Sequence, residues 1–494
     1  MDEERVLSSL RRDNPWWSKQ SIDWDENYYK RSHYYMLRRQ IEEEEITGLL
    51  GPRRVGKTTI LKQIAEYLVE EKDVPTERIF FVQMDNPYLN SSLEDPLKDI
   101  LEVYQDYILE DSFENIEEPV YIFLDEIQVL DNWAEKLKYW YDLDYELVFT
   151  ITGSSSAKIT AGSESLLGRI IDRNMLPLKF SETIKMKREC GEMDLEMEHQ
   201  KNKHIMKSSF EKAIKEDDPK GLYRAFTKNT SFLRNDKSKI KPELERYLNR
   251  GGYPRIIQKE IEEGLDLDYA SRKLENDAEK AIQKDASEIY DVSPDKLMKI
   301  AIFIADNTAQ KLVKSSLSDF VGVSGSTAAK YVDHLEEAYI IHRSKHYSGS
   351  AAASERKQQK SYIWDPGFRN AIVGSLGGNY NMPPEEKGLV VESVCADHMK
   401  RLSYSIEGSK ENVYFWDYQQ GEVDIVLNIS DKTVPIEVKY RDEVKKSDLK
   451  GLNRFIYDNG IDYGIVITKD KTDIMELREG KAVLIPLWSL LMMI

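Results

Sequence analysis

The stretch Gly51-Pro-Arg-Arg-Val-Gly56-Lys57-Thr58 decides how the whole sequence is interpreted. It lies between a short apolar run at residues 46–50 and a segment whose apolar residues recur at helical spacing. Glycines let a backbone turn tightly around phosphates, a lysine pairs with the β- and γ-phosphates, and a hydroxyl binds magnesium; the alternative is a plain glycine turn. The pattern predicts a site for ATP and Mg²⁺, with Thr58 on the metal, at Gly51, Pro52, Arg53, Arg54, Val55, Gly56, Lys57, Thr58 and Thr59.

An acidic pair supplies the second half of such a site. The apolar run 120–124 ends in Asp125 and Glu126. We expect Asp125 to hold Mg²⁺ through water and Glu126 to polarise the water that attacks ATP. The alternative is that both are solvated acids at a strand end.

Polar and basic residues follow on the next two elements. Thr152 ends the apolar run 146–152 and is a candidate to sense the γ-phosphate or orient the water; a serine-rich turn is the alternative. Arg169 and Arg173 are candidates to stabilise charge on the transferred phosphate, from the same chain or from a neighbouring subunit. The alternative is that both are surface arginines.

Bulk composition bounds the class of protein. With 40% hydrophobic and 32% charged residues, the sequence is typical of a globular protein. The two cysteines, Cys190 and Cys395, cannot build a disulfide framework, and there is no apolar run of about 18 residues. We expect a cytoplasmic protein without a membrane segment. The net charge of −18 argues against a surface that coats nucleic acid uniformly, although a local basic stripe would suffice to bind it.

A local basic stripe lies in the third quarter of the chain. Helix-like stretches at 296–308, 314–321 and 326–338, followed by strand-like 339–342 and 360–364, predict a winged helix. Small and hydroxyl residues, Ser324 to Thr327, begin its third helix. The predicted wing is acidic only at Glu355 and carries five basic residues, Arg343, Lys345, Arg356, Lys357 and Lys360. We expect it to contact DNA, duplex or branched; the alternative is a protein-docking module.

A second chemical constellation lies near the C-terminal end. Glu392 is on a predicted helix, and Asp424 and Glu437 are on neighbouring strands, with Glu437 and Lys439 on one face. Asp424 and Glu437 are predicted to bind Mg²⁺, with Lys439 near a scissile phosphodiester and Glu392 supporting metal or water. The alternative is a pair of salt-bridged surface strands.

With these residues in hand, the chain resembles the archaeal ATPase family of the AAA/STAND type, which joins a P-loop ATPase to a winged helix and a nuclease-like domain. The C-terminal block is similar to the PD-(D/E)xK nuclease superfamily, with Val423-Asp424 in place of Pro-Asp. The resemblance implies that Pro254, in a Gly-Gly-Tyr-Pro turn, contacts the nucleotide. The other matching stretches are 51–59, 123–128, 152–156, 168–169 with 176–180, 362–367, 388–392 and 422–439.

The predicted fold class is therefore a multidomain α/β protein. We expect an N-terminal arm at 1–35, a P-loop parallel-sheet ATPase core at 36–180, a helical lid or insertion at 181–290, a winged helix at 291–375 and a restriction-endonuclease-like α/β domain at 385–494. The last strand expected in that domain is 463–467, and a short tail follows it. The predicted function is a homo-oligomeric ATPase that engages DNA and presents a Mg²⁺-dependent nuclease domain. The alternatives are a DNA remodeller whose nuclease fold only binds, and a STAND-like switch that acts on a protein partner.

Overall fold

The computed structural model describes residues 2–494 except 20–21, 23–28, 42–44, 155–165, 167, 196–198, 265–266, 349, 375–381, 409–411 and 420. The chain forms two compact units. The first comprises Met1–Leu176 with Glu337–Tyr339, and the second comprises Pro177–Glu336 with Ile340–Ile494. No helix among the described residues is both long and apolar enough to cross a membrane.

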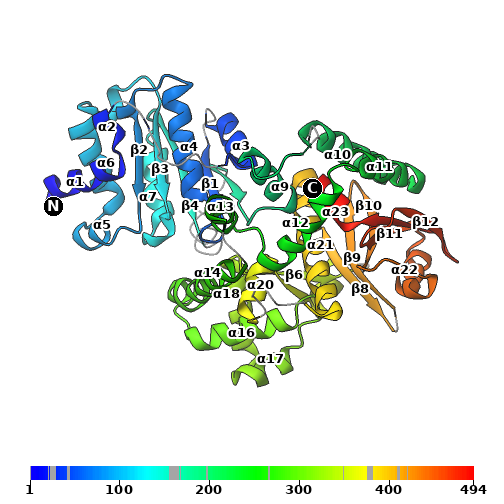
Figure 1. Ribbon diagram of the computed structural model, residues 1–494. Coiled ribbons are helices and arrows are strands. Elements are labelled where there is room, and N and C mark those ends of the chain that lie inside the picture. The colour runs from blue at the N-terminus through cyan, green and yellow to red at the C-terminus, as the bar shows by residue number, and fades with distance from the viewer. Residues whose placement is uncertain are drawn as a thin grey trace. The chain divides into compact units, whose positions relative to one another are not determined.

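A five-stranded parallel sheet forms the centre of the first unit (Figure 1). Its strands are β1 (Ile46–Leu50), β2 (Ile79–Gln83), β3 (Val120–Asp125), β4 (Leu147–Gly153) and β5 (Ile170–Asn174). Their order is β2-β3-β4-β1-β5, and every residue of β1 and β3 is buried, as expected when helices cover both faces of a parallel sheet. The apolar runs 46–50, 120–124 and 146–152 of the sequence correspond to β1, β3 and β4.

Helices connect these strands. They are α4 (Lys57–Glu70) after β1, α5 (Pro87–Ser92) and α6 (Pro96–Tyr104) after β2, and α7 (Trp133–Tyr141) after β3. The buried residues Ile60, Leu61, Ile64 and Leu68 recur at helical spacing and give α4 one apolar face.

The N-terminal arm covers the edge of this sheet. Helix α1 (Glu3–Asp13) lies beside β2 (Figure 1). The side chain of Asn14 donates to Phe81 O and accepts from Phe81 N, each at 2.7 Å, as a neighbouring strand would. The indole of Trp16 donates to Ile79 O at 3.0 Å. The arm thus forms hydrogen bonds with backbone N–H and C=O groups of β2 that would otherwise remain unpaired at the edge of the sheet.

The second unit begins with helices. They are α9 (Phe180–Glu189), α10 (His199–Lys215), α11 (Pro219–Phe232), α12 (Lys237–Arg250), α13 (Pro254–Glu263), α14 (Leu267–Glu279) and α15 (Ser287–Tyr290). The helical character predicted for 181–290 is present. Phe210 of α10, Phe226 of α11 and Leu244 of α12 belong to the same buried cluster as the C-terminal strands, so these helices share the core of the second unit.

Five more helices and the two strands of a hairpin follow among the described residues. They are α16 (Pro294–Asp306), α17 (Lys314–Val321), α18 (Gly325–Glu337), β6 (Ile341–His346), α19 (Ala351–Arg356), β7 (Lys360–Ile363) and α20 (Pro366–Ile372). Strands β6 and β7 are antiparallel, with Ser344 opposite Lys360.

The hairpin is continuous with the C-terminal sheet. The remaining elements are α21 (Pro384–Glu407), β8 (Val413–Tyr418), β9 (Gly421–Ile429), β10 (Lys432–Lys439), α22 (Lys450–Asn459), β11 (Tyr463–Thr468), β12 (Asp473–Glu476), β13 (Lys481–Pro486) and α23 (Leu487–Met493). Together with the hairpin they form one eight-stranded sheet, β12-β13-β11-β10-β9-β8-β6-β7. Strand β6 pairs in parallel with β8 through Lys345–Tyr414 and His346–Phe415.

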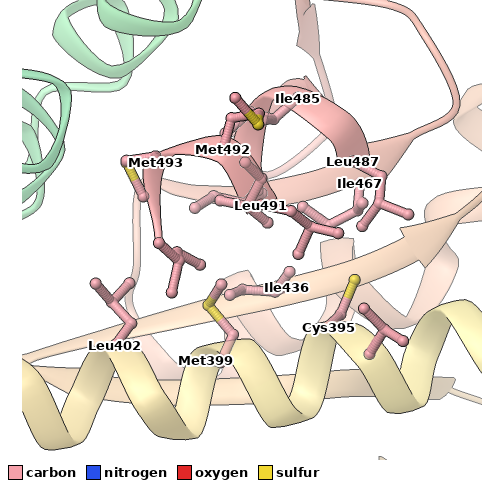
Figure 2. Close-up of a cluster of buried hydrophobic side chains, with 14 of the residues drawn as sticks. Cys395, Met399, Leu402, Ile436, Ile467, Ile485, Leu487, Leu491, Met492 and Met493 are labelled. Atoms are coloured by element: carbon pink, nitrogen blue, oxygen red, sulfur yellow. The ribbon is translucent and has the colours of Figure 1, made fainter. Parts of the chain in front are cut away.

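The last three elements correct the sequence analysis, which treated the residues after β11 as a short tail. Strand β13 pairs with β11, and α23 closes the apolar core. Figure 2 shows Cys395, Met399 and Leu402 of α21 across Ile436 from Leu491 of α23.

Candidate functional site

The glycine-rich loop leaves β1 and enters α4. A Cβ atom on Gly51 would lie 1.9 Å from Met175 O, so a larger residue does not fit there. Gly56 has φ +98°, a conformation that side chains disfavour. Lys57 is 4% exposed, and its ammonium donates to Gly51 O at 2.9 Å and Pro52 O at 3.1 Å. The carbonyl groups of Gly51 and Pro52 therefore fix the ammonium of Lys57 next to the loop.

Asp125 meets two hydroxyl groups. Thr58 Oγ1 donates to Asp125 Oδ2 at 2.7 Å, and Thr152 Oγ1 donates to Asp125 Oδ1 at 2.5 Å. The strand order explains this contact, because β4 lies between β1 and β3 and Thr152, its second-to-last residue, lies at the same edge. Burial raises the pKa of Asp125, and the hydroxyl of Thr152 opposes that rise. Thr58 and Asp125 thus offer adjacent oxygens of the kind that Mg²⁺ prefers.

Glu126 is held from two sides. Its Oε1 lies 3.6 Å from Lys57 Nζ, and its Oε2 accepts from Gln128 Nε2 at 2.6 Å. Burial alone would raise its pKa, but Lys57 and Gln128 outweigh burial and leave the pKa below its usual value. The backbone of Glu126 is left-handed, with φ +56°, and its N–H donates to Thr152 Oγ1 at 2.9 Å. Strained backbone of this kind clusters at functional sites.

Two residues of the site were missed in the sequence. Gln128 orients Glu126. Arg31, from the N-terminal arm, is buried, and its guanidinium donates to Val55 O and to Leu176 O, each at 2.9 Å. Val55 is part of the phosphate loop, so the hydrogen bond from Arg31 fixes the position of the loop backbone. A lone arginine 24 residues upstream carries no sequence signal for this role.

The structure separates Arg169 from the phosphate loop. Ile170 pairs with Ile46, at the end of β1 opposite Gly51, and Arg169 forms an ion pair with Asp142 at 2.9 Å. The expected role of Arg169 within the same chain is therefore wrong, because four residues of extended strand span about 13 Å. A role from a neighbouring subunit remains a prediction. Arg173 donates to Gln40 Oε1 at 3.5 Å.

Pro254 lies at the start of α13, in the second unit, and its contact with nucleotide remains a prediction. The turn before it is held by Asp365, whose Oδ2 accepts from Gly252 N at 2.7 Å and whose Oδ1 accepts from Phe368 N at 2.9 Å. Burial raises the pKa of Asp365 to about 6.

The predicted C-terminal residues do come together. Ile436 lies opposite Ile425, which places Glu437 of β10 and Asp424 of β9 side by side. Asp424 Oδ2 accepts from Val438 N at 2.7 Å, and Lys439 Nζ donates to Glu437 Oε1 at 2.5 Å. Glu437 Oε2 is buried and has no hydrogen-bond partner. Burial, with Asp424 nearby, raises the pKa of Glu437 well above its usual value.

Lys360 of β7, which the sequence analysis placed in the predicted wing, lies in this cluster. It is 2% exposed, and its ammonium lies 2.7 Å from Glu392 Oε1, 2.7 Å from Glu422 Oε1 and 4.0 Å from Asp424 Oδ1. Burial raises the pKa of Glu392 to about 8, with Lys360 opposing that rise. Among the described residues, no three His, Cys, Asp or Glu side chains are grouped in a way that could hold a metal ion.

The predicted basic wing is partly wrong, because Lys360 does not lie on its surface. A buried lysine paired with carboxylates cannot serve as an exposed phosphate contact. Arg343 forms ion pairs with Glu336 and with Asp333, and Lys345 pairs with Glu355 at 2.6 Å. The side chain of Arg356 lies outside the described part of the chain. The loop is therefore much less cationic than its sequence suggests.

Comparisons with known proteins bear on these sites. A family model of the AAA domain matches residues 43–184, and two domains of unknown function, DUF8612 and DUF4143, match residues 241–377 and 387–490. An uncharacterized protein of Haemophilus influenzae is 23% identical over 418 residues, which are 83% of this chain and 86% of that protein. An uncharacterized protein of Methanocaldococcus jannaschii is 24% identical over 452 residues, covering 88% and 85% of the two chains.

Solved structures show weaker similarity. The Aeropyrum pernix Orc1 protein in complex with DNA is 11% identical, with a TM-score of 0.32, over 70% of this chain and 93% of its own. The Saccharomyces cerevisiae Hsp104:casein complex is 16% identical, with a TM-score of 0.25, over 41% of this chain and 36% of its own. Neither likeness supports an inference about function. Residues 43–184 are thus similar to the AAA domain, and they contain the parallel sheet and the contacts of Asp125 beside the phosphate loop.

Proposed function

We propose that this chain binds MgATP at residues 51–59 and hydrolyses it. The hydrolysis drives a nucleotide-dependent switch. The observation that carries this proposal is the junction of Thr58, Asp125 and Thr152 beside the phosphate loop. Lys57 supports the switch, because its ammonium pairs with loop carbonyls and lies near Glu126. A bound γ-phosphate would compete for the same ammonium, so nucleotide entry must rearrange both side chains.

The roles follow from the contacts. The N–H groups of the loop and the ammonium of Lys57 bind phosphate oxygens. Thr58, and Asp125 through water, would hold Mg²⁺, which would supply neutralisation of the phosphate charge. Glu126 accepts a proton from the attacking water, and its pKa below the usual value keeps it ionised for that task. Gln128 fixes the carboxylate, and Thr152 fixes Asp125.

Two variants test this proposal. Lys57→Ala removes the charge that binds phosphates, so it should abolish tight ATP binding. Glu126→Gln keeps the shape of the side chain but cannot accept the proton, so it should bind ATP and hydrolyse it at least about tenfold more slowly. Binding of a fluorescent ATP analogue and phosphate release measure the two steps separately. Normal turnover in Glu126→Gln would remove Glu126 from the mechanism.

DNA engagement is the second candidate. It is favoured by α17 and α18, which have the succession of a helix-turn-helix followed by a hairpin, and by the exposed residues Ser324, Ser326 and Lys330 at the start of α18. Because most wing cations are paired with acids, we place the contact on α17 and α18 rather than on the wing alone.

A salt titration tests the DNA contact. Lys314, Lys330 and Lys357 are exposed, and replacing all three by Gln should flatten the slope of log affinity against log salt by up to about 2.7, at about 0.9 per phosphate contact. Lys98→Gln, an exposed lysine of the first unit, is the control and should leave the slope unchanged. If the triple variant also keeps its slope, α17 and α18 dock a protein instead.

The C-terminal fold is proposed to bind rather than to cut. Asp424, Glu437, Lys439 and Glu392 have the types and neighbourhood expected of a nuclease, but the donor set does not fit a resident Mg²⁺. Lys360 already pairs with Glu392 and Glu422, and Lys439 already pairs with Glu437. We therefore propose that the nuclease-like fold binds its partner without cutting it.

A further inference from the structure

We propose that the ammonium of Lys360 takes the place of a divalent cation in the C-terminal acidic cluster, formed by Glu392, Glu422, Asp424 and Glu437. The cluster is then complete without metal, and replacing Lys360 opens a metal site that the natural chain lacks. This inference concerns the second unit alone and does not rest on ATP hydrolysis.

Position is the first argument. Lys360 Nζ lies within 4.0 Å of oxygens from three carboxylates, on α21 and β9. A hard cation in a protein likewise collects several carboxylate oxygens around one point. The ammonium also lies 5.6 Å from the centroid of the Phe415 ring, so its remaining side faces an apolar wall.

Burial is the second argument. Glu392, Asp424 and Glu437 are each less than 10% exposed, and buried carboxylates need a cation or a proton. At 2% exposed, Lys360 is more deeply buried than these three carboxylates, so it is a core residue and not a surface lysine. Its stem is fixed by β7, where Lys360 pairs with Ser344 of β6.

The unsatisfied oxygen is the third argument. Glu437 Oε2 is buried without a hydrogen-bond partner, although Oε1 accepts from Lys439. An oxygen of this kind beside Asp424 and Glu392 is a ligand available to a cation, once the positive charge of Lys360 no longer repels that cation. Removing Lys360 while keeping the carboxylates therefore creates the conditions for Mn²⁺ or Mg²⁺ binding.

The test measures Mn²⁺ binding to nucleotide-free protein, and electron paramagnetic resonance of the free ion detects that binding. Lys360→Met keeps most of the length of the side chain and removes its charge. We expect it to bind Mn²⁺ at least about tenfold more tightly than wild type, because the repulsion from an adjacent charge is gone. The gain should disappear in the Lys360→Met, Asp424→Asn double variant. The matched control is Lys345→Met on the same hairpin, whose partner is Glu355, and it should gain no site.

Thermal unfolding gives a second readout. Lys360→Met should melt at a lower temperature in EDTA than wild type and should recover in Mn²⁺, whereas wild type should be indifferent to both. If Lys360→Met unfolds in EDTA, Mn²⁺ should restore its native circular dichroism. Three results would overturn the proposal: an Asp424-dependent Mn²⁺ site of equal affinity in wild type, a folded Lys360→Met protein without that site, or an unfolded one that Mn²⁺ does not restore. None of them bears on ATP turnover, so failure here is distinct from failure of the proposed ATPase.

Discussion

Arg31 gives the sharpest prediction about the nucleotide site. Its guanidinium is buried and makes two hydrogen bonds of 2.9 Å, to Val55 O in the phosphate loop and to Leu176 O after β5. Hydrogen bonds to charged groups contribute about 1.5–3 kcal/mol each, so Arg31→Met should lower the free energy of unfolding of the first unit by at least about 3 kcal/mol. It should also weaken ATP binding, because the carbonyl of Val55 loses the contact that fixes the loop.

The assay for Arg31 has two parts. Urea unfolding measures the stability change, and binding of a fluorescent ATP analogue measures the loop. Arg5→Met is the matched control, because Arg5 is an arginine of the same arm whose ion pair with Asp2 is exposed, and such pairs contribute about 0–1 kcal/mol. Equal stability and equal ATP affinity in the two variants would refute the reasoning that Arg31 holds the phosphate loop.

Three further outcomes are expected. Thr152→Val removes the hydroxyl that donates to Asp125, so ATP hydrolysis should slow by about tenfold or more in steady-state assays, while unchanged turnover would make Thr152 a bystander. Asp365 has a pKa of about 6 in the folded state against an ordinary 3.8, so between these pH values the folded state binds a proton that the unfolded state does not. The free energy of unfolding should therefore fall by about 3 kcal/mol as pH rises from about 4 to 6, and then stay level. Asp365→Asn should lose that slope in unfolding experiments at matched pH, and a retained slope would assign it to another group. If Arg169 acts from a neighbouring subunit, then Lys57→Ala protein, which retains Arg169, should restore hydrolysis when mixed with Arg169→Ala protein; absence of rescue would count against that role.

The phosphate loop was predictable because its chemistry is local. Gly51, Gly56, Lys57 and Thr58 lie within eight residues, and the backbone between them is dictated by glycine. Asp125 and Thr152 were also predictable, because carboxyl ends of parallel strands meet at one edge of a sheet. The same rule, applied to strand direction, would have excluded Arg169, which precedes its strand rather than following it.

Lys360 and Arg31 could not be predicted, since each acts at long range. Lys360 is 32 residues from Glu392 and meets it only because β6 joins the C-terminal sheet. In the sequence it stood among other cations of a loop, and that composition favoured a solvent-exposed surface. The tail after β11 was misjudged for a related reason, because β13 and α23 gain their stability from the core they close and not from a strong local pattern.

The shared eight-stranded sheet limits how this protein can be dissected. A cut near residue 380 follows the boundary expected from sequence, yet it would separate β6 and β7 from β8. The C-terminal fragment would then present β8 as a bare edge, ready to recruit strands from other molecules. It would also lose Lys360 and leave Glu392 and Asp424 buried without their counter-charge. An isolated C-terminal fragment is therefore a poor reagent for biochemistry, and fragments that start before residue 341 are the ones to express.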